Sequence, residues 1–335
     1  MDKNKLQNFN NSFTMAEILI SLTIIGIIAA ITLPALQANI NEKTWATRRK
    51  ALYSRLSQAI SMMPSLNGYG IGVDDNETAE KATEAFITNG LGKVLELNNI
   101  CAYNKMADCG IVSKYTRRGN IVVHSNFPTD MTSLNRYITN TTDNGLQHIV
   151  NTKAGAFITK NGESVAVFYN PYCIPRDIMA HSNFSGYSDR LEHRIQNYLC
   201  ANFIYDLNGR KGPNRIGDDM GVITAMYSTE PDVLALELYK KKLSTGIGNY
   251  ATGLRECRKH NGYRLPNIDE LTAIWYNYAI FDTYTSGDYL SATNGRVEGI
   301  TYKLTWVQNF SSYGYRWIAS ATNEFNSMRI LCIRR

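Results

Sequence analysis

The stretch A154-G-A-F-I-T-K-N-G-E-S-V-A-V-F-Y169 decides the fold of this chain. Two runs of alternating apolar residues flank Asn161-Gly162, a dipeptide that is favoured in type I′ hairpin turns. Such alternation is typical of strands with one buried face. The stretch therefore predicts an antiparallel β-hairpin, and a further strand is expected at Ala201–Tyr205.

The residues from Phe13 to Met63 predict one long helix, and Pro64 marks its expected end. No residue between Ile18 and Asn41 is charged, so this part is long enough to cross a bilayer as a helix. An antiparallel sheet laid against the following, amphipathic part would bury its apolar stripe. That stripe recurs at helical spacing and consists of Trp45, Leu52, Leu56, Ala59, Ile60 and Met63.

Glu17 and Pro34 do not suit a plain membrane anchor, because a carboxylate is costly in hydrocarbon and a proline bends a helix. The residues S12-F-T-M-A-E-I-L-I-S-L22 resemble the cleavage and methylation motif of type IV prepilins and type II secretion pseudopilins. The resemblance implies that a prepilin peptidase cuts between Ser12 and Phe13 and that the new Phe13 amine is methylated. It also implies a filament of several subunits, in which Glu17 meets the terminal ammonium of a neighbour and Pro34 bends the helix. Ser12 departs from the family, which prefers Gly before the cut.

Composition narrows the class of protein. The chain has 335 residues, of which 44% are hydrophobic and 19% charged, so a folded protein of about two domains is expected. The net charge of +6 comes from scattered Lys and Arg residues without a basic stripe. We therefore expect no binding of nucleic acid.

The cysteines indicate disulfides in an oxidising compartment. There are six and none forms a C-x-x-C pair, which argues against a zinc ribbon. Six cysteines allow many connectivities. Pairing neighbours in the sequence favours Cys101–Cys109 and Cys173–Cys200, which leaves Cys257–Cys332.

The segment D206-L-N-G-R-K-G-P-N-R-I-G-D-D219 is rich in turn-forming residues. Its oxygen-bearing side chains are of the kind that Ca²⁺ prefers, although the EF-hand pattern is not met. A hydrogen-bonded turn without metal is the alternative, and we expect no other cofactor. The candidate calcium ligands are Asp206, Asn208, Asn214 and Asp218.

The last hundred residues predict helices at Val233–Leu243 and Tyr250–Asn261, and a capping box from Asn267 to Glu270. Four strand-like runs follow. The order resembles the C-type-lectin-like fold, which formylglycine-generating enzymes share. This resemblance implies the Cys257–Cys332 disulfide and a buried Trp306, while Leu290 and Leu331 depart from the family pattern. The segments that carry it are G262-Y-R-L-P-N-I-D-E-L271, Y289-L-S-A-T-N294, W306-V-Q-N-F310 and I330-L-C-I-R334.

The final strands also predict a surface that binds an extracellular protein or glycan, because Tyr, Trp, Asn and Ser suit binding surfaces. Some proteins of this fold are hypervariable ligand binders, and the composition is compatible with that. No catalytic motif is present: only Cys332 lies in the last 75 residues, and H-E-x-x-H and G-x-S-x-G are absent. The candidate binding residues are Tyr302, Gln308, Asn309, Tyr313, Tyr315, Trp317, Asn323 and Asn326.

The sequence thus predicts an α+β fold in which a long N-terminal transmembrane helix packs on a small antiparallel sheet and a C-type-lectin-like domain follows. The expected parts are a leader (1–12), the helix (13–64), a pilin-like domain (65–232) and the lectin-like domain (233–335). The expected function is that of a minor pilin that displays a binding or adhesion domain. A structural pseudopilin of a type II secretion system and, more weakly, a membrane-anchored enzyme are the alternatives. The expected location is the bacterial inner membrane, crossed once, and then a filament in the periplasm or at the cell surface.

Overall fold

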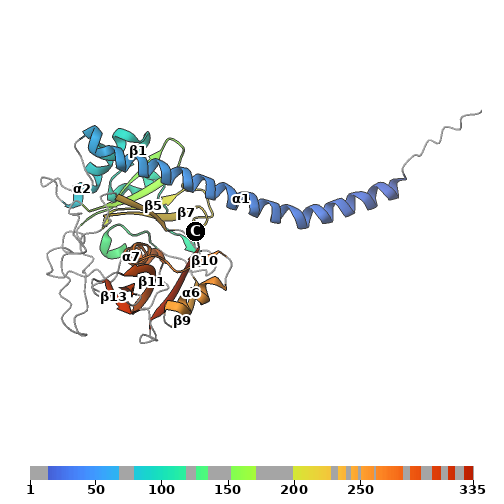
Figure 1. Ribbon diagram of the computed structural model, residues 1–335. Coiled ribbons are helices and arrows are strands. Elements are labelled where there is room, and N and C mark those ends of the chain that lie inside the picture. Colours follow the sequence, from blue (N-terminus) through green and yellow to red (C-terminus); the bar gives the residue numbers. More distant parts are fainter. Residues whose placement is uncertain are drawn as a thin grey trace, which may run out of the picture. The chain divides into compact units, whose positions relative to one another are not determined.

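The computed structural model describes residues 14–67, 79–117, 126–134, 152–170, 199–227, 233–238, 243–247, 250–259, 262–281, 287–295, 304–310, 316–320 and 328–334 (Figure 1). The chain divides into two units, one up to Arg48 and one from Arg49 onward. The helices are α1 (Met15–Asn67), α2 (Ala79–Ala85), the π-helix η1 (Phe86–Leu91), α3 (Gly92–Val94), the 3₁₀ helix η2 (Tyr103–Cys109), α4 (Met131–Leu134), α6 (Tyr250–Arg258), α7 (Ile268–Tyr276) and α8 (Tyr278–Phe281).

The strands form two sheets. The first has the order β1-β3-β4-β5-β7-β6-β2, with β8 also paired to β7, and the second has the order β10-β14-β11-β12-β13, with β9 also paired to β14. Their bounds are β1 (Leu97–Cys101), β2 (Thr116–Arg117), β3 (Gly155–Thr159), β4 (Ser164–Tyr169), β5 (Leu199–Asp206), β6 (Arg215–Ile216), β7 (Met220–Tyr227), β8 (Val233–Leu238), β9 (Leu243–Ile247), β10 (Tyr263–Arg264), β11 (Asp288–Gly295), β12 (Leu304–Asn309), β13 (Arg316–Ser320) and β14 (Arg329–Arg334).

The predicted hairpin is confirmed as β3 and β4, which pair antiparallel, and the strand predicted at Ala201–Tyr205 is the middle of β5. The expected type I′ turn is wrong, because such a turn needs positive φ at both central residues. Gly162 has φ +82°, but Asn161 does not have a positive φ, because Asn214 is the one non-glycine residue in the described part of the chain that does. Gly162 N–H donates to Thr159 O (2.9 Å) and Thr159 N–H to Glu163 O (3.0 Å). The loop therefore has three residues and ends in a left-handed glycine.

The second half of α1 packs on the first sheet through part of the predicted stripe. Trp45 is only half-buried and the side chain of Met63 lies outside the described residues, while four members are at most 3% exposed: Leu52, Leu56, Ala59 and Ile60. Arg55 fixes the position of this helix, since its Nη2 lies 2.5 Å from Oε1 of the buried Glu163. The Thr159 hydroxyl donates to the other oxygen of Glu163. The helix continues past Pro64 to Asn67, beyond the predicted end.

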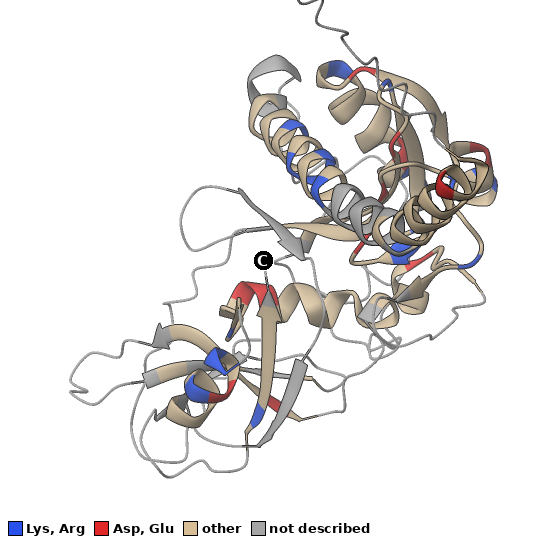
Figure 2. Ribbon diagram, turned by 90° about the vertical axis from the view of Figure 1, so that its right-hand side faces the viewer, with Lys and Arg blue, Asp and Glu red and all other residues tan. Residues whose placement is uncertain are grey.

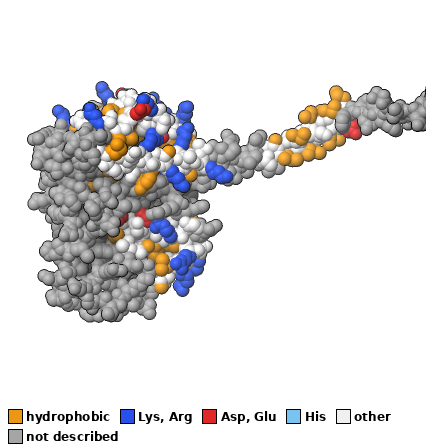
Figure 3. Space-filling model, turned by 45° about the horizontal axis from the view of Figure 1, so that its top comes forward, with side chains coloured by type: hydrophobic (Ala, Val, Ile, Leu, Met, Phe, Trp, Pro, Cys, Tyr) orange, Lys and Arg blue, Asp and Glu red, His pale blue; other side chains and the backbone are white. Residues whose placement is uncertain are grey.

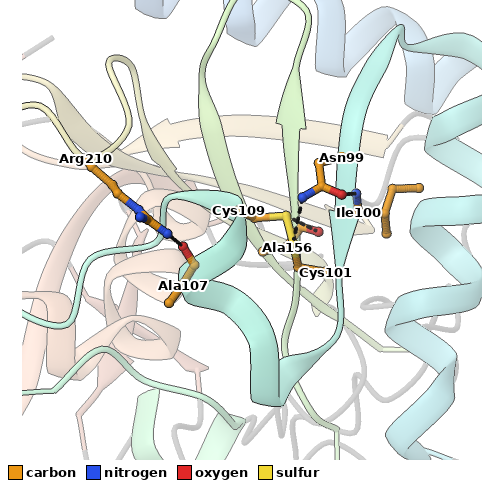
Figure 4. Close-up of a disulfide and its surroundings, with 7 residues drawn as sticks. All are labelled: Asn99, Ile100, Cys101, Ala107, Cys109, Ala156 and Arg210. Carbon is orange, nitrogen blue, oxygen red and sulfur yellow. Dashed lines mark hydrogen bonds between the residues drawn. A yellow bond between two sulfur atoms is a disulfide. The ribbon is translucent and has the colours of Figure 1, made fainter.

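Two of the predicted disulfides are present. Cys101–Cys109 closes η2 against β1, and Cys257–Cys332 joins α6 to β14. Around the first, Arg210 donates to the Ala107 carbonyl and the Asn99 amide donates to Cys101 Sγ (3.4 Å) (Figure 4). Cys200 is also disulfide-bonded, and its expected partner Cys173 lies outside the described residues.

The helix predicted at Val233–Leu243 is wrong, because residues 233–238 form β8, which pairs antiparallel with β7 over its whole length. Leu, Ala and Glu favour helices, but hydrogen bonding along an existing strand overrides so weak a preference. The expected domain boundary moves accordingly. Residues 233–238 belong to the first sheet, and both sheets lie within the unit that begins at Arg49.

The predicted transmembrane helix is contradicted. Within the part of the chain that the structure describes, no helix is long and apolar enough to cross a membrane. The fold class is corrected to an α and β protein with two sheets, in which the described residues form no membrane-spanning helix. The expected single pass through the inner membrane is corrected with it.

Replacing Arg55 by Met should destabilise the protein by about 1–3 kcal/mol, because the buried Glu163 carboxylate would lose its cation while the apolar stem is kept. Urea unfolding followed by circular dichroism measures the change. Lys160→Met is the matched control, since Lys160 and Glu96 form an ion pair (2.6 Å) in which both side chains are exposed and such pairs add little stability. Equal effects of the two substitutions would contradict the role of Arg55.

Candidate functional site

The start of α1 is built around a capping box that joins Thr14 and Glu17. Thr14 precedes the first helical residue, and its carbonyl accepts a hydrogen bond from Ile18 N–H (3.2 Å). Glu17 N–H donates to Thr14 Oγ1 (3.3 Å), and Thr14 N–H donates to Glu17 Oε2 (2.9 Å). Each side chain thus satisfies a backbone donor that the helix leaves unpaired. The Thr14 backbone N–H and, second, its hydroxyl lower the pKa of Glu17, which is therefore ionised at neutral pH.

The apolar side chains on either side of Glu17 are exposed at successive positions around the helix. Figure 3 shows hydrophobic side chains on the face of this part of α1 that is turned to the viewer. Leu19 and Leu22 are both 61% exposed and Ile25 is 62% exposed. A helix that is apolar all round is normally buried in a larger assembly or a bilayer. The exposed set also includes Met15, Ile18, Ile20, Ile24, Ile27 and Ile28.

The structure does not test the predicted roles of three other residues of this region. Ser12 and Phe13, at the expected cleavage site, lie outside the described residues. Pro34 lies inside α1, where the helix continues through it. Cleavage after Ser12 and a bend at Pro34 stay predictions.

The turn between β5 and β7 contains two buried carboxylates. Asp206 is 2% exposed and Asp219 0%. Asp206 Oδ1 accepts from Asn208 N–H (3.1 Å), while Asp219 accepts from Asn214 N–H (2.9 Å) and Arg215 N–H (2.8 Å). Burial raises the pKa of both groups, and the charge of Asp219 helps to raise that of Asp206 to about 8.

The expected calcium ligands do not converge in this turn. The Asp218 carboxylate lies 3.3 Å from Arg215 Nη1. With its amide nitrogen toward Asp206, Asn214 donates to Asp206 Oδ2 (3.2 Å), so it acts as a donor and not as a ligand oxygen. Asn208 Nδ2 donates to Gly212 O (3.2 Å). The arrangement fits the alternative of a hydrogen-bonded turn, and calcium binding stays a prediction.

The segment 262–271 is one of those that resemble the C-type-lectin-like fold. Its polar side chains hold the start of α7 in place. The capping box is confirmed: Glu270 N–H donates to Asn267 Oδ1 (2.7 Å) and Asn267 N–H donates to Glu270 Oε2 (2.8 Å). Arg264 donates to both oxygens of Glu270, at 2.8 and 2.5 Å. Ile268 N–H donates to Thr293 Oγ1 (2.9 Å), which fastens the start of α7 to β11. Acidic residues mark this start of α7 in Figure 2.

The predicted binding residues are only partly placed. Gln308 and Asn309 lie on β12 and Trp317 on the adjacent β13, where Gln308 pairs with Arg316 and Trp317 with Val307. The side chains of these residues and of Trp306 lie outside the described part, so a buried Trp306 stays a prediction. The other binding residues are outside it altogether: Tyr302, Tyr313, Tyr315, Asn323 and Asn326.

The sequence analysis did not identify two residues of these sites, Thr14 and Asp219. Thr14 is the cap of α1, and the T-x-x-E spacing of Thr14 and Glu17 is a capping-box pattern that the sequence already contains. Asp219 shares the buried turn with Asp206, whereas the neighbouring Asp218 was expected there. Which of two adjacent aspartates turns inward depends on the strand β7 that follows, and no local pattern distinguishes them.

Comparison with known proteins gives no relative: no family model, no curated protein and no solved structure matches this chain. The resemblances to pilins and to the lectin-like fold therefore rest on the residues alone.

Asp206 should contribute a loss of stability as the pH rises from 3.8 toward about 8, its ordinary and its folded pKa. Between these values the folded state keeps a proton that the unfolded chain has released, so a higher pH favours unfolding. Asp206→Asn should weaken this dependence, as measured by the midpoint of thermal unfolding between pH 5 and pH 8. Asp218→Asn, on the same turn, should leave it in place. An Asp206→Asn profile parallel to that of the unmodified protein would contradict the raised pKa.

Proposed function

We propose that this chain is a subunit of a type IV pilus-like filament that displays a ligand-binding C-terminal region. The observation that carries the proposal is the apolar surface of α1 between Met15 and Ile28, which is exposed on all sides. Surfaces of this kind are covered by partners. One partner covers one side of a helix, so an all-round apolar helix favours a bundle of several copies.

Glu17 supports the same proposal. Its Oε2 is held by Thr14, which orients the carboxylate at the end of the helix. In the proposed filament this carboxylate accepts the terminal ammonium of a neighbouring subunit, at Phe13 after cleavage. Two charges that are each costly in an apolar bundle become tolerable when they are paired. The pairing would set the axial position of one subunit against the next.

The displayed region is the second sheet, and its proposed role is binding and not catalysis. Gln308, Asn309 and Trp317 lie on its adjacent strands β12 and β13. The proposed ligand is an extracellular protein or glycan. A structural pseudopilin, whose last domain contacts only cargo or neighbouring subunits, is the competing proposal.

The processing step is tested by the intact mass of the chain from cells that contain a prepilin peptidase. We expect loss of residues 1–12 and the gain of one methyl group. An uncut N-terminus would overturn the filament proposal.

Glu17→Gln should reduce the yield of filaments at least about tenfold, because a neutral amide loses the attraction of a charge pair in an apolar bundle. Sheared filaments quantified by immunoblot measure the yield, and intact mass verifies that cleavage is unchanged. Glu96→Gln, which affects an exposed ion pair with Lys160, is the control. Normal filament yield with Glu17→Gln would contradict the assembly role.

Arrays of glycans and extracellular proteins, probed with the chain from Arg49 onward, test the displayed region. Reproducible binding that Trp317→Ala and Gln308→Ala abolish supports the binder. Absence of any ligand would favour the structural pseudopilin.

A further inference from the structure

The first sheet is covered on both faces. Strands alternate their side chains between faces, and Ala156, Ala166 and Phe168 share one hydrophobic core with Leu271, Trp275 and other residues of α7 and α8. The intervening Phe157, Val165 and Val167 are equally buried and point to the opposite face. Figures 1 and 2 show α7 on one side of the sheet and the second half of α1 on the other.

A cluster of three polar side chains, here named the amide cluster, lies between the first sheet and α7. It consists of Asn202 on β5, Thr224 on β7 and Asn277 at the end of α7, all 0% exposed. Asn202 Nδ2 donates to Asn277 Oδ1 (2.6 Å), and Thr224 Oγ1 donates to Asn202 Oδ1 (2.7 Å). Asn277 Nδ2 donates to Ala273 O (2.7 Å) and lies 3.2 Å from Asn202 Oδ1.

Such a cluster fixes one arrangement of the layers. Close-packed apolar layers resist a shift through the shape of their side chains, and a buried amide that loses its partner adds the full cost of its desolvation. A shift of α7 along the sheet would separate Asn277 from both Asn202 and Thr224. Tyr115 adds a second polar link, because its hydroxyl donates to Ala279 O (3.3 Å) from the buried core.

We infer that the two sheets open and move as one body, with the amide cluster as the lock that sets their register. The C-terminal region is then a rigid outer layer and not a separable module on a linker. A load on its strands is transmitted directly to the sheet that holds α1 from Arg49 onward. This inference does not depend on the proposed filament.

Hydrogen exchange of the whole chain, followed by mass spectrometry, tests the inference. In the unmodified protein we expect the slowest amides of β4 and β5 to exchange at the same rate as those of β11 and β14, because one body opens in one step. In Asn277→Ala the amides of β11 and β14 should exchange at least about tenfold faster than those of β4. Asn202→Ala, which breaks the same contact from the other side, should give the same difference.

Thr272→Ala is the matched control. Thr272 is also fully buried on α7, but its hydroxyl donates to Ile268 O (3.0 Å) within the helix. It should speed exchange equally in both sheets. The inference is overturned if β11 and β14 already exchange faster than β4 in the unmodified protein. It is also overturned if Asn277→Ala accelerates both sheets equally, as Thr272→Ala does.

Discussion

Burial of both faces of strand β4 is the constraint on which this fold depends. Every residue from Ser164 to Tyr169 is buried. A strand in that position needs a layer on each side, and a single helix supplies only one. The second half of α1 covers one face, and α7 with α8 covers the other. The C-terminal region is therefore part of the core of the first sheet.

The sequence was sufficient to predict the elements whose geometry depends only on residues close together in the chain. The β3–β4 hairpin, β5, the capping box of α7 and the packed stripe of α1 from Leu52 to Ile60 could be predicted, because periodicity and capping act within a few residues. The two disulfides Cys101–Cys109 and Cys257–Cys332 also followed from the sequence.

The errors concern features that depend on distant partners. Residues 233–238 form a strand because β7 offers its edge, although their composition favours a helix. The loop between β3 and β4 has three residues and not the two of a type I′ turn. In this longer loop Gly162 has the positive φ and Asn161 does not. The inward-facing aspartate of the turn is Asp219, and its position depends on where β7 begins. An apolar run predicts that a surface is covered, but it does not tell what covers it. The expected membrane span is contradicted, since no helix among the described residues is long and apolar enough for one.

Apolar contacts and buried polar groups have separate tasks in this molecule. The apolar layers bring α1, the sheets and α7 together, and a polar contact then sets the register of each element. The ion pair of Arg55 and Glu163 sets the position of α1, and the hydrogen bond between Asn202 and Asn277 sets that of α7. The ion pair of Arg264 and Glu270 sets the position of the segment before α7. Between Met15 and Ala30, by contrast, α1 carries one charged residue, Glu17. If copies of this helix assemble, the same logic assigns their register to Glu17, the one charged residue among these apolar side chains.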